Sequence, residues 1–117
     1  MLDVTPDKAA AVYDCLRHFE PWRSLDLPPA EEVEFHVRSR RDCYAEYTHT
    51  GKTHVILVSQ LLIGSMETLV SVVGHEMLHV AQEQHGTSNS AQHNAEFRRL
   101  ARIACRKMVW DERAFVG

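Results

Sequence analysis

The stretch SMETLVSVVGHEMLHVAQEQHG, residues 65–86, is the segment of the chain that most clearly has the periodicity of an α-helix. Ser65 is a suitable N-cap, and Gly86 fits the position after the last turn. At 1.5 Å per residue, roughly 21 residues make a helix about 31 Å long. We therefore predict that this long helix is the element around which the fold is built.

The middle of this predicted helix carries the motif GHEMLHV, residues 74–80. His75 and His79 are four residues apart, so both imidazoles project from one face and can bind a single Zn²⁺. Glu76 flanks that face, too offset to act easily as a ligand but well placed to accept a proton from a zinc-bound water. This is the H-E-x-x-H arrangement of metallopeptidases. Polar side chains among so many apolar neighbours are costly unless they are paired or bound to a metal.

A catalytic zinc site needs a third protein ligand and leaves the fourth position open for water. Three residues downstream are candidates: His85, His93 and Glu96. His85 points away from the pair if the helix is continuous. His93 starts the next predicted helix, after a turn that lets the chain fold back, and is favoured. Glu96 lies one turn further, where it could instead support a ligand or act as a first-turn acid.

Upstream of the long helix the hydrophobic period changes to two, which predicts strands over residues 33–37, 43–49 and 53–59. Gly51 marks a turn between the last two. The third segment, THVILVS, is apolar on both faces, as expected of a central strand covered on both sides. The short connections favour antiparallel neighbours joined by hairpins.

Two further helices complete the prediction. One is capped by Thr5, with Pro6 at its first position, and is ended by Pro21; the other covers about residues 93–108. The buried face of the second carries Phe97, Leu100, Ala101, Ala104 and Met108. We therefore predict one α+β domain over residues 1–117, in which a small three-stranded antiparallel sheet packs on the long helix.

Composition narrows the classes of function. The 117 residues carry a net charge of −3, so nucleic-acid binding, for which the run Arg38–Arg41 is a candidate, is only weakly supported. The three cysteines form no CxxC pair and favour a reducing compartment. No secretory signal and no apolar run of about 18 residues is found, so we expect a cytoplasmic protein without a membrane span.

Several other polar and aromatic residues have both a structural and a functional interpretation. Tyr44 and Tyr47 point to opposite faces of their strand, so at most one faces the site; packing is favoured for both over a role at an oxyanion. The strand over residues 43–48 could hold an extended substrate by β-addition. Structural roles are also expected for the remaining candidates: His36, His54, Trp22, Trp110 and Cys105.

Four segments together resemble the SprT-like family of zinc-dependent metallopeptidase domains, in the same order along residues 25–105. These are LDLPP…VEF, GKTHVILVSQLL, LVSVVGHEMLHVAQ and HNAEF. The resemblance implies one Zn²⁺ on His75, His79 and His93, with Glu76 as general base, and hydrolysis of a polypeptide substrate. Asn94 stands where the family usually has Gly. The alternative function is a non-catalytic, zinc-stabilised protein-interaction domain.

Overall fold

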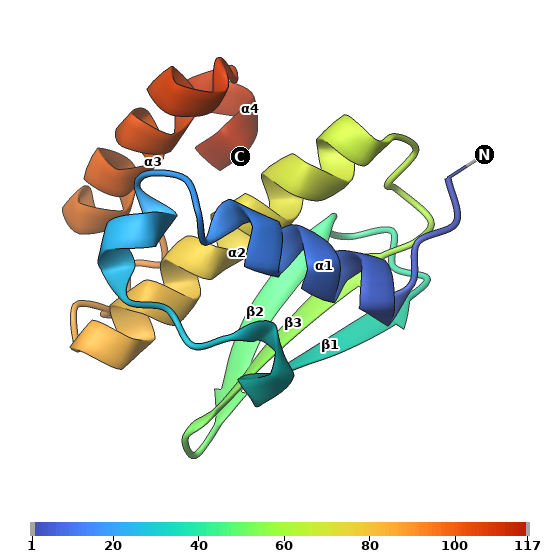
Figure 1. Cartoon of the computed structure of the whole chain (residues 1–117), viewed down its shortest axis with the longest axis horizontal. Coiled ribbons are helices and arrows are strands. Elements are labelled where there is room, and N and C mark those ends of the chain that lie inside the picture. The colour runs from blue at the N-terminus through green and yellow to red at the C-terminus, as the bar shows by residue number, and fades with distance from the viewer. Residues whose placement is uncertain (1, 117) are drawn as a thin grey trace.

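The computed structural model describes residues 2–116, and its elements follow the predicted α+β order (Figure 1). The helices and strands of this part of the chain are α1 (Pro6–Leu16), β1 (Val33–Arg38), β2 (Ala45–Thr50), β3 (Thr53–Ser59), α2 (Met66–His85), α3 (Ala95–Met108) and α4 (Glu112–Val116). Two 3₁₀ turns, Trp22–Leu25 and Ala30–Glu32, lie between α1 and β1.

The long helix α2 begins and ends where its sequence signals predict. The Ser65 side chain accepts a hydrogen bond from the backbone N–H of Thr68 at 3.1 Å. At the other end Gly86 has φ of 71°, the left-handed conformation that glycine adopts at low cost. Local sequence signals are therefore enough to predict both boundaries of α2.

The sheet is mixed, so the prediction of a purely antiparallel sheet is wrong in one detail. Its strand order is β1-β3-β2, with β2 and β3 antiparallel but β1 and β3 parallel. The connection over residues 39–44 makes no hairpin. It passes the end of β3 instead, where Ser59 N–H donates to the Tyr44 carbonyl at 2.8 Å and Gln60 N–H donates to the Arg38 carbonyl at 2.9 Å. The central place predicted for β3 is confirmed.

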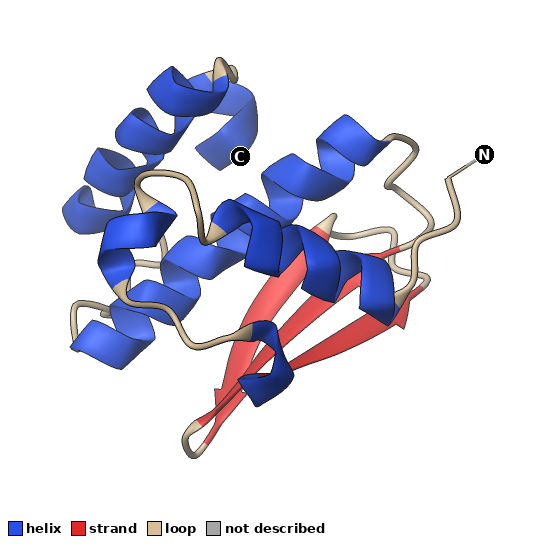
Figure 2. Cartoon of the chain, in the orientation of Figure 1, coloured by secondary structure: helices blue, strands red, loops and turns tan. Residues whose placement is uncertain are grey.

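Helices α1 and α2 lie on the same side of the sheet, and α3 and α4 pack against α2 (Figure 2). On the helix-facing side of β3, Ile56 and Val58 have no exposed surface. Tyr13 of α1 packs edge-on against Phe35 of β1, with ring centroids 5.6 Å apart. The other face of β3 is less covered than predicted, because Val55 there is only half-buried.

The first and last helices differ from prediction at their ends. The first starts at its Thr5 cap but ends at Leu16, well before Pro21. Helix α3 starts at Ala95, so His93 lies in the loop before it. The short helix α4 was not predicted at all. No helix in the described residues is both long and apolar enough to cross a membrane.

Candidate metal centre

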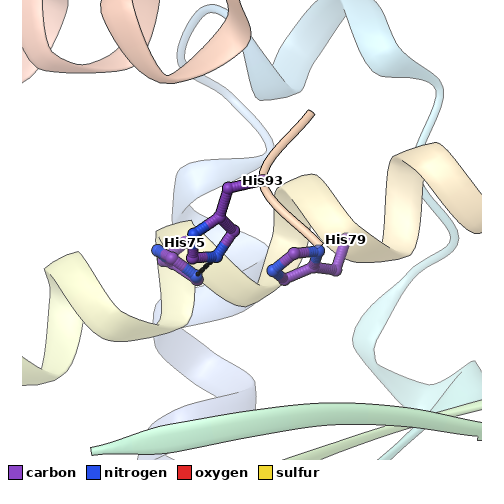
Figure 3. A group of neighbouring side chains, drawn as sticks. All are labelled: His75, His79 and His93. Atoms are coloured by element: carbon purple, nitrogen blue, oxygen red, sulfur yellow. Dashed lines mark hydrogen bonds between the residues drawn. The ribbon is translucent and has the colours of Figure 1, made fainter. Parts of the chain in front are cut away.

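His75 and His79 lie near the middle of α2 and project from the same side of the helix (Figure 3). Their ring centroids are 5.2 Å apart, as expected for residues one helical turn from each other. The intervening Met77 and Leu78 have no exposed surface. Packing of this part of α2 in the core therefore sets the positions of both imidazoles.

His93 reaches this pair from the loop between α2 and α3 (Figure 3). The loop is held by Asn94, the N-cap of α3, whose side-chain oxygen accepts from the Phe97 backbone N–H at 3.0 Å and from Gln82 of α2 at 2.8 Å. Its amide nitrogen donates to the Thr87 carbonyl at 3.0 Å. Since Gln82 is 2% exposed, these bonds tie the loop firmly to the buried helix beside the histidine pair.

The three histidines form a compact cluster. Each offers one ring nitrogen, and these nitrogens all lie within 4.8 Å of one another. Nε2 of His93 lies 3.2 Å from Nε2 of His75. The ring of Phe97 contacts all three, with centroid distances of 4.5 to 4.9 Å. Such a set of converging nitrogens could hold a metal ion.

Burial keeps these imidazoles uncharged at neutral pH. It lowers the pKa of His75 to about 4 and, together with repulsion from the other two rings, that of His79 to about 3. The pKa of His93 is lowered as well, chiefly by burial. Neutral imidazole is the form that binds metal. The donor set of three neutral nitrogens therefore fits Zn²⁺, for which three histidines and an open position are a known catalytic arrangement.

Glu76 lines the same cleft as the histidines and is 5% exposed. One of its carboxylate oxygens lies 3.9 Å from Nε2 of His75. Burial, with a smaller contribution from the carboxylate of Glu46, raises the pKa of Glu76 to about 8. Without a metal ion, a pKa of about 8 leaves most of this carboxyl group protonated at pH 7. A cation held by the three histidines would favour the carboxylate, which is the form that can accept a proton and later return it.

The other two candidates for a third ligand have partners of their own, away from the cluster. The imidazole Nε2 of His85 lies 2.7 Å from the Leu25 carbonyl. Glu96 pairs with Arg99 at 2.6 Å on the exposed side of α3. Of the three, only His93 joins His75 and His79 in the cluster.

The cluster opens onto a cleft of about 860 Å³ between β2 and α2. β2 is an edge strand of the sheet, and its residues Ala45–His49 form one wall. Arg40 pairs there with Asp42 at 2.7 Å and with Glu46 at 3.1 Å, so its charge is largely matched by carboxylates of this chain. The cleft is lined by both polar and apolar side chains, and the edge strand β2 forms one side of it.

Of the two tyrosines, only Tyr47 packs against the cluster. Its ring stacks on that of His79, with centroids 6.2 Å apart, and its hydroxyl lies 2.6 Å from Nδ1 of His54. Tyr44 also lines the cleft but is half exposed. His54 thus has the local partner predicted for it, as does His36, which pairs with Glu34 at 3.2 Å.

Helix α4 supplies site residues that the sequence did not reveal. Ala114, Phe115 and Val116 line the cleft, and the Phe115 carbonyl lies 2.6 Å from Nδ1 of His75. A five-residue helix has too few turns for a hydrophobic period to be recognised. The structural role predicted for Trp22 is confirmed, because this residue lies in the main core and is 1% exposed.

The chain matches a known protein family. The SprT-like family profile matches residues 12–112, most of the chain, including β1 to β3 and all three clustered histidines. No curated protein matches the sequence. On the strength of the family match, the chain belongs to the SprT-like family.

Proposed function

We propose that this protein is a zinc-dependent metallopeptidase that hydrolyses polypeptide with Glu76 as general base. The observation that carries the proposal is a single arrangement. Three neutral histidines and one buried carboxyl group meet in a cleft beside a free sheet edge.

The proposed metal ligands are His75, His79 and His93, with one Zn²⁺ per chain. Three nitrogen donors leave one coordination position for water or substrate. When bound there, zinc supplies Lewis acidity, which lowers the pKa of a water molecule and polarises a carbonyl group.

Glu76 is the group of this chain that moves the proton. Its carboxylate accepts a proton from the attacking water as the oxygen adds to the substrate carbonyl. It then donates that proton to the leaving amine as the C–N bond breaks. Glu76 is only 5% exposed, so little bulk water reaches its carboxyl group. The low local dielectric strengthens the electrostatic interactions between this group and the reacting groups.

The sheet edge supports a polypeptide substrate. The backbone of β2 pairs with β3 on one side only, so an extended segment can add to the other side by main-chain hydrogen bonds. Residues 43–48, expected from the sequence to do this, lie along the cleft wall next to the cluster. Main-chain hydrogen bonds recognise the backbone of the bound segment more than its side chains. We therefore propose that unfolded chains of many different sequences are accepted as substrates. The free cysteines Cys15, Cys43 and Cys105 support a reducing, cytoplasmic setting.

The experiment that tests this function compares wild-type protein with Glu76→Gln, each loaded with one equivalent of Zn²⁺, on an unfolded polypeptide such as reduced casein. Glutamine keeps the shape of the side chain but cannot take a proton. We expect cleavage by the wild type and a loss of roughly 10²- to 10⁴-fold in the variant at equal zinc content. Glu96→Gln is the matched control, because Glu96 lies outside the cluster. Zinc bound without any cleavage would favour the non-catalytic interaction domain.

A further inference from the structure

We propose that the backbone carbonyl of Phe115, in α4, positions His75 for metal binding through Nε2. The contact joins Nδ1 of His75 to this oxygen at 2.6 Å, across 40 residues of sequence. The inference rests on the metal site of the proposed function, and it adds a positioning group contributed by an element outside the H-E-x-x-H helix.

The contact determines which nitrogen of His75 carries the proton. A carbonyl oxygen can only accept, so Nδ1 must donate, and in neutral imidazole this leaves the lone pair on Nε2. A ligating histidine commonly donates its second ring N–H in this way, which fixes the tautomer and makes the ligating nitrogen more basic.

The free nitrogen faces the centre of the cluster. Nε2 of His75 lies 3.2 Å from Nε2 of His93 and 3.9 Å from a carboxylate oxygen of Glu76. Nδ1 points the opposite way, toward α4. The Phe115 carbonyl therefore selects the tautomer that a metal ion in the cluster would require, before any ion is bound.

The carbonyl is available because of where it lies in α4. The last four carbonyls of a helix have no partner within the helix. In a helix as short as Glu112–Val116, the Phe115 carbonyl is one of these, so it can accept from His75 without breaking a helical bond.

An aromatic stack holds α4 in place against the metal helix. Phe115 is 6% exposed and stacks on Trp110, with centroids 5.4 Å apart. Trp110 packs edge-on against Trp22 at 6.0 Å, and Nε1 of Trp22 donates to the Gly74 carbonyl at 3.0 Å. The stack of Trp22, Trp110 and Phe115 thus joins α4 to the residue directly before His75.

This contact lies beyond the part of the chain that the family match covers. The match ends at residue 112, whereas the acceptor is Phe115. Neither the H-E-x-x-H motif nor the third histidine requires a helix at this place.

The first test reads the tautomer directly. In the metal-free full chain at neutral pH, ¹⁵N NMR of the histidine rings should show His75 protonated at Nδ1, with a ring proton in slow exchange. After one equivalent of Zn²⁺, Nδ1 should keep its proton and Nε2 should shift. Protonation of His75 at Nε2 in the metal-free wild type would overturn the proposal, and this reading needs no variant to fold.

The second test measures zinc affinity by competition with a chelator. Phe115→Ala removes the ring that anchors α4, so we expect zinc to bind roughly 10- to 100-fold more weakly and the slow-exchanging Nδ1 proton of His75 to disappear. Phe115→Leu keeps an apolar anchor and should restore both properties toward the wild type. Arg113→Ala, at an exposed position of α4, is the matched control and should change neither.

The outcomes separate this inference from the proposed function. Unchanged zinc affinity in a folded Phe115→Ala would overturn the positioning role even if the wild type cleaves polypeptide. Weakened affinity with loss of the Nδ1 proton would support it even if no polypeptide is cleaved. A wild type that binds no zinc would overturn both.

Discussion

At the scale of single residues, the site depends on two kinds of ionisable group whose charge is suppressed by the same burial. In the metal-free protein, burial lowers the pKa of His75 and raises the pKa of Glu76, so each group favours its neutral form. Without a metal ion, this arrangement costs stability, because a buried carboxylate is unfavourable unless a cation or a hydrogen-bond donor is near. Burial of these groups thus lowers the stability of the metal-free protein.

Glu76→Gln should therefore stabilise the metal-free protein, and more so as the pH rises. The pKa of Glu76 is about 8 when folded, against 4.5 as its ordinary value. The folded state thus holds the proton more tightly, and stability falls as the pH rises from about 4.5 through about 8. Glutamine does not titrate, so the variant should gain a few kcal/mol over wild type by pH 9, but less than about 1 kcal/mol at pH 5.

Urea unfolding of both proteins in the presence of a chelator, at pH 5, 7 and 9, measures this difference. His75 and His79 titrate in both proteins, so their contribution largely cancels. A constant difference between the two stabilities across this pH range would contradict the environment assigned to Glu76.

The prediction of the third histidine of the cluster shows what a residue pattern can and cannot predict. His93 was favoured over His85 and Glu96 because it follows a helix break, and it is the one that joins the cluster. How it is held was not predictable. Asn94 has φ of −72°, so its backbone needs no glycine, and its side chain bonds Gln82 and Thr87. Such contacts depend on which segments meet in space.

At the scale of elements, local signals predicted helices well and strand pairing less well. The sequence signals for the two caps of α2, at Ser65 and Gly86, each lie within a few adjacent residues, and both caps were predicted correctly. The direction of β1 relative to β3 depends on the path of residues 39–44, which has no local signature. Yet β3 was predicted to be the central strand, with β1 and β2 on either side of it. A short connection reverses the chain from β1 to β2, and the hairpin reverses it again from β2 to β3, so β3 must run parallel to β1. Combining those two predictions would have corrected the sheet.

The packing between Trp22 and α2 gives an element-scale prediction at Gly74. A Cβ atom there would lie 2.8 Å from Cζ2 of Trp22, a ring that is 1% exposed and has little room to move. Helix propensity alone favours alanine over glycine by up to about 1 kcal/mol. We expect the clash to outweigh this, so that Gly74→Ala destabilises the protein by about 1–3 kcal/mol.

Chemical denaturation of Gly74→Ala measures the effect, with Gly64→Ala as the control. No atom lies within 4 Å of a Cβ built at Gly64, which also lacks a positive φ, so that variant should stay close to wild type. Stabilisation by Gly74→Ala would show that Trp22 does not pack closely on this turn of α2.

At the scale of the whole molecule, the site is assembled from segments far apart in the sequence. α2 supplies two histidines and Glu76, the loop before α3 supplies His93, and residues of α4 line the cleft. The sheet contributes an edge and not a ligand. The H-E-x-x-H motif predicted the first of these contributions. The helix break before His93 and the family resemblance both pointed to the second, but α4 was visible only in the fold.

The central claim is that the three histidines hold one zinc ion, and elemental analysis of zinc per chain tests it most directly. Wild type and His93→Ala are compared after reconstitution with Zn²⁺ and removal of excess metal. His85→Ala is the control, because His85 contacts the Leu25 carbonyl outside the cluster. We expect about one zinc per chain in wild type and in His85→Ala, and a sharp loss in His93→Ala. No zinc in the wild type, or full occupancy in His93→Ala, would contradict the three-histidine site.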